Sequence, residues 1–146
     1  MSYVKIWIHA VWTVKNRKPI LASEIRQEVF EHIHQNALSK EILVETVGGH
    51  HNHVHCLSRL KNNQTIENIM QLIKGESSYW FNRSGLSRLK LNWQKEYFAV
   101  SVSESQVEKV KNYILTQEEH HKRKTWEDEY NEFIEKYGFA VFKNKD

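Results

Sequence analysis

Two hydrophobic periodicities alternate along this chain in an order that few folds can accommodate. Patterns typical of strands cover residues 3–14, 42–47, 53–60 and 96–102. Amphipathic patterns typical of helices cover residues 23–39, 65–81, 106–117 and 125–136. The first six elements therefore follow the order β-α-β-β-α-β, which is typical of the split-βαβ, ferredoxin-like fold. We expect an α+β protein with an antiparallel sheet, helices on one face and a C-terminal helix that carries a tyrosine.

The length and composition of the chain favour one globular domain spanning residues 1–146. Forty per cent of its residues are hydrophobic and 12% are aromatic, which is enough to build one core without disulfide staples. The chain has one cysteine, so no disulfide can form within it. No apolar stretch is long enough for a membrane span, and the first residues lack the pattern of a secretory signal. We therefore expect a cytoplasmic protein with no membrane partner.

The net charge of +3 is too small to identify a partner, but the charge is unevenly distributed. Residues 1–23 and 59–95 carry net charges of +4 and +5, whereas residues 24–58 and 96–146 each carry −3. If the fold brings the two basic blocks together, they form a face that can bind phosphates; the alternative is an ordinary solvated surface. The candidate phosphate contacts in these blocks are Lys15, Arg17, Lys18, Lys74, Arg83, Arg88, Lys90 and Lys95.

The sharpest local motif is His53-Val54-His55. Side chains alternate along a strand, so the two histidines share one face and the valine lies on the other. Two imidazoles at this spacing can share a divalent metal ion, because histidine is the commonest metal ligand in proteins. The alternative is a pair of histidines on a half-exposed strand with no metal, and the triplet alone does not decide between the two.

The helical segment 106–117 offers a third ligand. Tyr113 and Gln117 are four residues apart and therefore share a helical face. If this face lies over the two histidines, Gln117 supplies a neutral oxygen ligand and the Tyr113 hydroxyl lies beside the metal. A tyrosine on an amphipathic helix is more often a core or surface aromatic, and the polar glutamine one turn later favours the functional interpretation.

Several segments resemble, in the same order, the motifs of the HUH-superfamily single-tyrosine transposases. These are the TnpA-type enzymes of the smallest bacterial insertion sequences and their REP-associated relatives. The similar segments are residues 12–21, 48–57, 73–78, 93–102, 113–121 and 125–130. The resemblance extends over about residues 3–139, and the order of the motifs makes it specific. One position departs from the pattern, because Asn52 stands where many relatives carry an acid.

The resemblance implies a site and a reaction. His53 and His55 would bind Mg²⁺ or Mn²⁺ with Gln117 as the third ligand, and Tyr113 would be the nucleophile. The enzyme would cleave and rejoin single-stranded DNA with hairpin ends, at the ends of an insertion sequence, through a metal-assisted phosphotyrosine intermediate. The candidate phosphate contacts named above would then bind the DNA backbone. The family also implies a homodimer.

Two other interpretations use fewer of these residues. A non-catalytic, ferredoxin-like module that binds single-stranded nucleic acid accounts for the basic blocks but leaves Tyr113 and Gln117 without a role. A metal-dependent hydrolase would use the two histidines and a metal-bound water, and it would not need Tyr113. Replacing Tyr113 by phenylalanine therefore discriminates among the three functions.

Overall fold

The computed structural model describes residues 2–137. Its strands are β1 (Ile6–Thr13), β2 (Leu43–Gly49), β3 (His53–Leu60) and β4 (Phe98–Val102). Its α-helices are α1 (Arg26–Ser39), α2 (Ile66–Ser84), α3 (Val107–Leu115), α4 (Gln117–His120) and α5 (Trp126–Tyr137). Two short 3-10 helices complete the described elements, η1 (Lys15–Arg17) and η2 (Glu104–Gln106).

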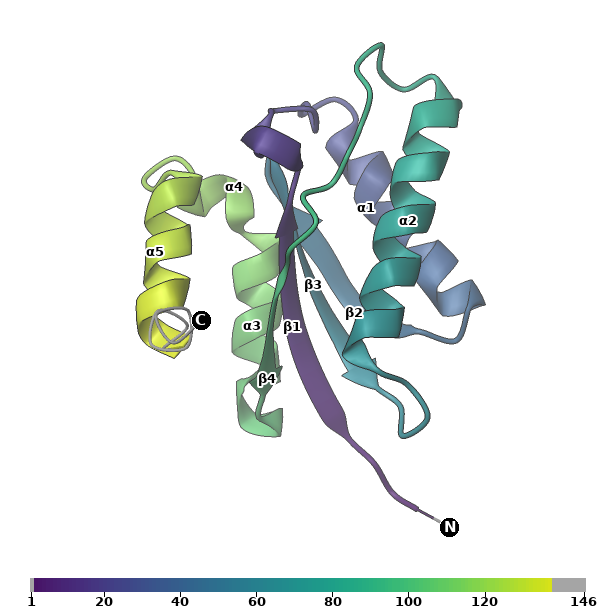
Figure 1. Ribbon diagram of the computed structural model, residues 1–146. Coiled ribbons are helices and arrows are strands. Elements are labelled where there is room, and N and C mark those ends of the chain that lie inside the picture. The colour runs from purple at the N-terminus through teal and green to yellow at the C-terminus, as the bar shows by residue number, and fades with distance from the viewer. Residues whose placement is uncertain (1, 138–146) are drawn as a thin grey trace.

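The four strands form one antiparallel sheet in the order β2-β3-β1-β4. Helices α1 and α2 pack on one face of this sheet, and α3 and α5 lie on the opposite side (Figure 1). The arrangement confirms the predicted α+β, split-βαβ fold. Because β1 pairs with both β3 and β4, it joins the two halves of the sheet.

The alternation of side chains along β1 supplies two separate cores. Ala10 and Trp12 project into the large core that α1 and α2 complete. Val11 projects the other way, into a smaller cluster with Trp126 and Phe133 of α5. Both faces of the sheet are therefore apolar at β1, and α5 is held against the sheet by aromatic packing.

Several element ends differ from the sequence prediction: β2 extends to Gly49, α2 extends to Ser84 and β4 begins at Phe98. β1 begins at Ile6, and α1 begins at Arg26 without a side-chain cap. The predicted continuous helix over residues 106–117 is interrupted, because α3 ends at Leu115 and a short helix α4 follows. At the break the Thr116 hydroxyl donates to the carbonyl of Asn112 at 2.8 Å. Such local side-chain bonds compete with the helical pattern and bend the chain.

Two helix starts follow the sequence signals. Thr65 caps the start of α2, where its hydroxyl accepts from the Asn68 amide at 3.2 Å. The helix ends at Ser84, three residues beyond the predicted end, and Gly85 follows it in the left-handed conformation. Helix α5 begins with a reciprocal pair of bonds between Thr125 and Asp128. None of the helices in residues 2–137 combines the length and the apolar character needed to cross a membrane.

Helix α3 packs closely on β2 at Gly48. A methyl group added at this position would lie 2.9 Å from Cγ2 of Ile114 and would also meet the Ile114 backbone carbonyl. Real side chains essentially never approach this closely, so only glycine permits the observed contact. Tyr113 is next to Ile114 on the same helix, so the contact at Gly48 sets the position of the tyrosine.

We expect Gly48→Ala to push α3 away from β2 and to lower the free energy of unfolding by about 1–3 kcal/mol, the usual cost of overpacking. Gly75→Ala is the matched control, because an added methyl at this position in α2 has nothing within 4 Å. The control is expected to raise stability by about 0.4–1 kcal/mol. Urea denaturation measures both, and an unchanged stability of Gly48→Ala would contradict the close approach.

Candidate functional site

The two histidines of the His53-Val54-His55 motif lie on β3, near the middle of the sheet. Both side chains are 0% exposed, and their ring centroids are 5.2 Å apart. Val54 projects to the opposite face and is buried in the large core. The alternation therefore places both imidazoles on the face that α3 and α5 cover.

A carboxylate from α5 completes the cluster. Oε1 of Glu129 lies 3.0 Å from Nε2 of His55 and 3.4 Å from Nε2 of His53. The ligand atoms of these three buried residues all lie within 4.8 Å of one another, so together they could hold a metal ion. The structure thus adds an acidic group to the two predicted histidines.

The sequence analysis missed Glu129 because Glu127, Asp128 and Glu129 look like the ordinary acidic first turn of a helix. A usable signal was present nonetheless. Glu129 follows Trp126 by three residues and precedes Phe133 by four, so it lies on the helix face that those two buried aromatics define. A carboxylate on a buried face requires partners, and that requirement points to a site.

Gln117 reaches the same cluster from the start of α4. Its Oε1 lies 3.0 Å from Nε2 of His53 and 3.2 Å from Nε2 of His121, and its Nε2 donates to the carbonyl of Tyr113 at 3.3 Å. The chain bends after α3, yet the amide still points toward the histidines. The structure therefore brings Gln117 next to His53, where a third ligand was expected.

Tyr113 lies beside the cluster on α3 of the same chain. Its hydroxyl donates a hydrogen bond to Oε2 of Glu129, and its ring centroid lies 5.5 Å from that of His55 in an edge-on arrangement. Glu129 therefore joins the tyrosine to the histidine pair, with one carboxylate oxygen for each.

The environment sets the protonation of these groups. Burial, reinforced by the negative charge of Glu129, raises the pKa of Tyr113 well above its ordinary value. Burial alone would raise the pKa of Glu129, but hydrogen bonds from the surrounding histidines outweigh it and hold this pKa well below its usual range. Burial lowers the pKa of His55 and lowers that of His9 to about 3. Near neutral pH the site therefore holds a carboxylate, a neutral phenol and neutral imidazoles at these two positions.

A second layer of contacts orients the two imidazoles. Nδ1 of His53 lies 2.8 Å from the side-chain oxygen of Asn52, and Nδ1 of His55 lies 2.9 Å from Nε2 of His9. Partners of this kind fix the tautomer and orientation of metal-binding histidines. Asn52, the position that departs from the family pattern, thus supplies an acceptor for the first histidine.

The donor set fits a divalent cation. Nε2 of His53 lies 3.0 Å from Oε1 of Gln117 and 3.4 Å from Oε1 of Glu129. A cation beside this nitrogen would therefore have two oxygens close to it. Imidazole, carboxylate and amide ligands together suit a divalent ion such as Mn²⁺ or Mg²⁺.

A family model described as "Transposase IS200 like" matches residues 2–117 of the chain. The chain belongs to the IS200-like transposase family. Helix α5 and its Glu129 lie outside the matched residues, so the carboxylate of the cluster comes from a part of this transposase that the family model does not cover.

Two solved structures are similar to this transposase. One is a protein of Deinococcus radiodurans R1 described as a transposase, with 21% identity and a TM-score of 0.62, covering 80% of this chain and 95% of the other. The second is a REP-associated tyrosine transposase bound to a REP hairpin, with 16% identity and a TM-score of 0.60, covering 83% and 72%. At these identities the likeness establishes the fold. A comparison with curated proteins gives no match.

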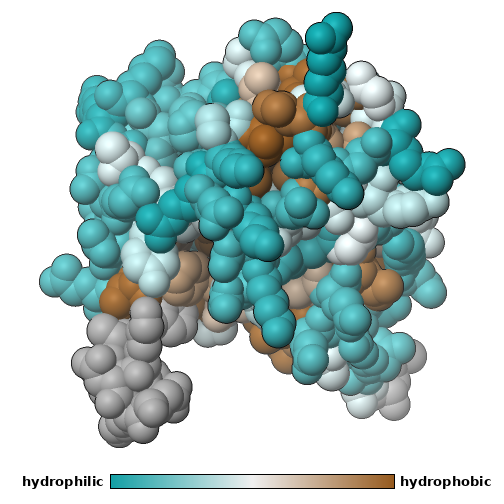
Figure 2. All heavy atoms as spheres, turned by 45° about the horizontal axis from the view of Figure 1, so that its top comes forward, coloured by the Kyte–Doolittle hydropathy of each residue, from teal (hydrophilic) through white to brown (hydrophobic). Residues whose placement is uncertain are grey.

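The two basic blocks of the transposase meet at one end of the molecule. The amide of Lys15 in η1 donates to the carbonyl of Asn92 at 2.8 Å, and Val14 forms an isolated bridge with Trp93. The surface at this end is mostly hydrophilic (Figure 2). The exposed predicted DNA contacts that have no side-chain partner in residues 2–137 are Lys15, Lys18, Arg88, Lys90 and Lys95.

The other three predicted contacts already have partners within the chain. Arg17 forms an ion pair with Glu127 of α5 at 3.0 Å. The Lys74 ammonium is half-buried and donates to two backbone carbonyls of the segment before β4, at 2.7 and 2.9 Å. The guanidinium of Arg83 lies over the ring of Tyr79 at 5.2 Å. A role of any of the eight basic residues in DNA binding stays a prediction.

We expect the transposase to bind one Mn²⁺ per chain and Glu129→Gln to weaken this binding by about tenfold or more, because it removes the charged ligand and keeps the shape. Glu135→Gln is the control, since Glu135 is an exposed carboxylate on the same helix. Isothermal titration calorimetry with MnCl₂ gives both affinities. An affinity that is the same in wild type and Glu129→Gln would remove the carboxylate from the metal site.

Proposed function

We propose that this transposase cleaves and rejoins single-stranded DNA at the ends of an insertion sequence through a covalent phosphotyrosine intermediate. The observation that carries the proposal is the hydrogen bond from the Tyr113 hydroxyl to Glu129, whose carboxylate also faces the two buried histidines. The Glu129 side chain thus contacts both the proposed nucleophile and the histidines of the candidate metal cluster. The chain that carries them belongs to the IS200-like transposase family.

His53 and His55 would hold Mg²⁺ or Mn²⁺, with Gln117 and Glu129 supplying oxygen ligands. When bound, the cation supplies positive charge that polarises the scissile phosphate and favours ionisation of a nearby hydroxyl. The chain itself contributes the fixed orientation of the imidazoles, which their Nδ1 contacts maintain.

Tyr113 would act as the nucleophile. Its oxygen forms a bond to phosphorus while the phosphodiester bond to the departing strand end breaks, and that end leaves as a hydroxyl. The phenolic proton is released to solvent water, and the departing oxygen takes a proton from solvent water to become that hydroxyl. The phosphodiester energy is retained in the phosphotyrosine bond, so a second strand end can attack and reverse the step without ATP.

Access to the cluster requires a movement of the Trp126 side chain on α5. Both imidazoles are 0% exposed, and the ring of Trp126 packs on His53 at 4.5 Å. A DNA phosphate can reach the histidines only when Trp126 gives way. The described conformation is therefore a closed one, in which Trp126 covers the site and Glu129 stays beside the two histidines.

The substrate and assembly form part of the proposal. We infer that the DNA carries hairpins at the ends of the element, as the similar structure bound to a REP hairpin suggests, and that the basic blocks contact its backbone. The protein would act as a homodimer in the cytoplasm, where the DNA is, with residues 1–146 forming a single domain.

The two competing functions leave specific contacts without a purpose. A non-catalytic binding module has no use for a nucleophile hydrogen-bonded to a buried carboxylate. A metal-dependent hydrolase would use the histidine cluster, but the Tyr113 hydroxyl beside it would then have no role in the reaction. The tyrosine is therefore the residue on which the test depends.

We expect the purified protein, with Mn²⁺ and a labelled single-stranded oligonucleotide carrying a hairpin from beside its own gene, to form an adduct that survives denaturation. Tyr113→Phe should abolish the adduct, because it removes the only attacking oxygen of that side chain, and Tyr79→Phe on exposed α2 should retain it. A denaturing gel detects both. Cleavage that persists in Tyr113→Phe would support the hydrolase, and binding of several flanking hairpins without cleavage would support the binding module.

A further inference from the structure

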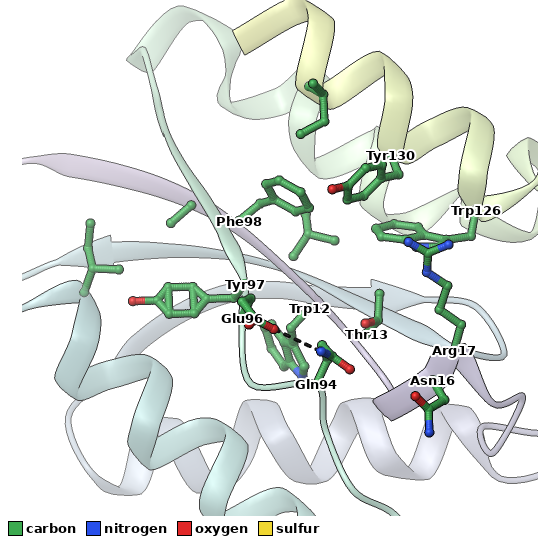
Figure 3. A pocket seen from close by; sticks show the side chains of 14 residues that line it. Trp12, Thr13, Asn16, Arg17, Gln94, Glu96, Tyr97, Phe98, Trp126 and Tyr130 are labelled. Carbon is green, nitrogen blue, oxygen red and sulfur yellow. Dashed lines mark hydrogen bonds between the residues drawn. The ribbon is translucent and has the colours of Figure 1, made fainter. Parts of the chain in front are cut away.

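A cavity of about 1080 Å³ opens where the chain enters β4 (Figure 3). Val11 pairs with Phe98, and Val14 forms an isolated bridge with Trp93. Between these two pairs, residues 12–13 on the β1 side lie opposite the four residues 94–97. The longer segment bulges away from β1, as extra residues in one strand of a pair do. The resulting space is bounded by the sheet edge on one side and by α5 on the other.

Aromatic rings from both sides line this cavity. Phe98 of β4 and Tyr130 of α5 meet edge to face with centroids 5.4 Å apart, and Trp126 lies 6.2 Å from Tyr130. Tyr97, in the segment that leads into β4, adds a further ring (Figure 3). Walls of this kind suit a flat aromatic ligand, because stacking on such rings is favourable.

The cavity also carries polar side chains. Gln94 donates to Glu96 at 3.0 Å at the edge of the cavity and adds an amide oxygen and a carboxylate. The edges of a nucleobase carry acceptors and donors that match such groups.

The mouth of the cavity is formed by strained backbone. Asn16 and Arg17 have φ values of 60° and 55°, a region that a residue such as arginine rarely adopts. Strain of this kind is concentrated at ligand sites. Here it places the Arg17 guanidinium 5.4 Å from the centroid of the Tyr130 ring, where it can contact the phosphate of a nucleotide whose base lies inside.

One side chain connects this cavity to the histidine cluster. Trp126 lines the cavity, and its ring also lies 4.5 Å from that of His53. We propose that the cavity binds an unpaired nucleobase of the single strand, next to the phosphate that the histidine site holds. This inference rests on the proposed function and specifies how the enzyme binds its substrate. Gln94 and Tyr97 belong to the segment that leads into β4, so this wall stays in place when the Trp126 side chain moves.

The test measures how much the bases contribute to binding. Fluorescence anisotropy compares the affinity of the full chain for labelled dT12 and for a 12-mer of abasic sites, in EDTA so that no cleavage occurs. Tyr130→Ala removes a wall of the cavity. Tyr79→Ala is its matched control, because Tyr79 also has an arginine over its ring but lies exposed on α2. Gln94→Ala, with exposed Gln35→Ala as its control, repeats the test without altering α5.

We expect wild type to prefer dT12, and Tyr130→Ala to weaken dT12 binding about tenfold while leaving abasic binding unchanged. Gln94→Ala should act in the same direction, and both controls should match wild type. Equal dT12 affinities in wild type, Tyr130→Ala and Gln94→Ala would overturn the nucleobase site and leave the phosphotyrosine adduct untouched. Loss of a dimer in Tyr130→Ala, seen by light scattering without a change in dT12 preference, would assign the cavity to a second copy. Absence of both DNA binding and adduct in wild type would overturn the proposed function as well.

Discussion

A single buried carboxylate holds the parts of this site together. Glu129 accepts a hydrogen bond from the Tyr113 hydroxyl through one oxygen and faces the two imidazoles of β3 through the other. A buried charge is tolerated only where its partners compensate for the lost water. This requirement selects one register for α5, in which Trp126 and Phe133 pack against the sheet. The same register covers the histidines and forms one wall of the neighbouring cavity.

The other half of the site depends on how closely a helix can approach the sheet. Gly48 lets α3 pack directly on β2, and this approach brings Tyr113 over the neighbouring strand β3. The bend at Thr116 then turns the chain so that Gln117 points back toward His53. A backbone contact and a helix break thus position groups that are otherwise separate in the chain.

Much of the fold could be predicted from local patterns. The order of strands and helices, the caps at Thr65 and Thr125 and the bounds of β3 follow from spacing over a few residues. The break after Leu115 could not, because an uninterrupted apolar period hides the competing bond of Thr116. Glu129 was missed for a related reason: an acid in the first turn of a helix is ordinary until the packing of that helix is known.

The sequence by itself determined which side chains share a face. His53 and His55 lie together because strands alternate, and Tyr113 and Gln117 lie one helical turn apart, both of which are properties of local backbone geometry. Only the tertiary structure decided which faces meet. Glu129 is 74 residues from the second histidine, and Gln117 is 64 residues from the first. Contacts over such separations depend on the packing of the whole chain, because no local periodicity records the distance between two elements.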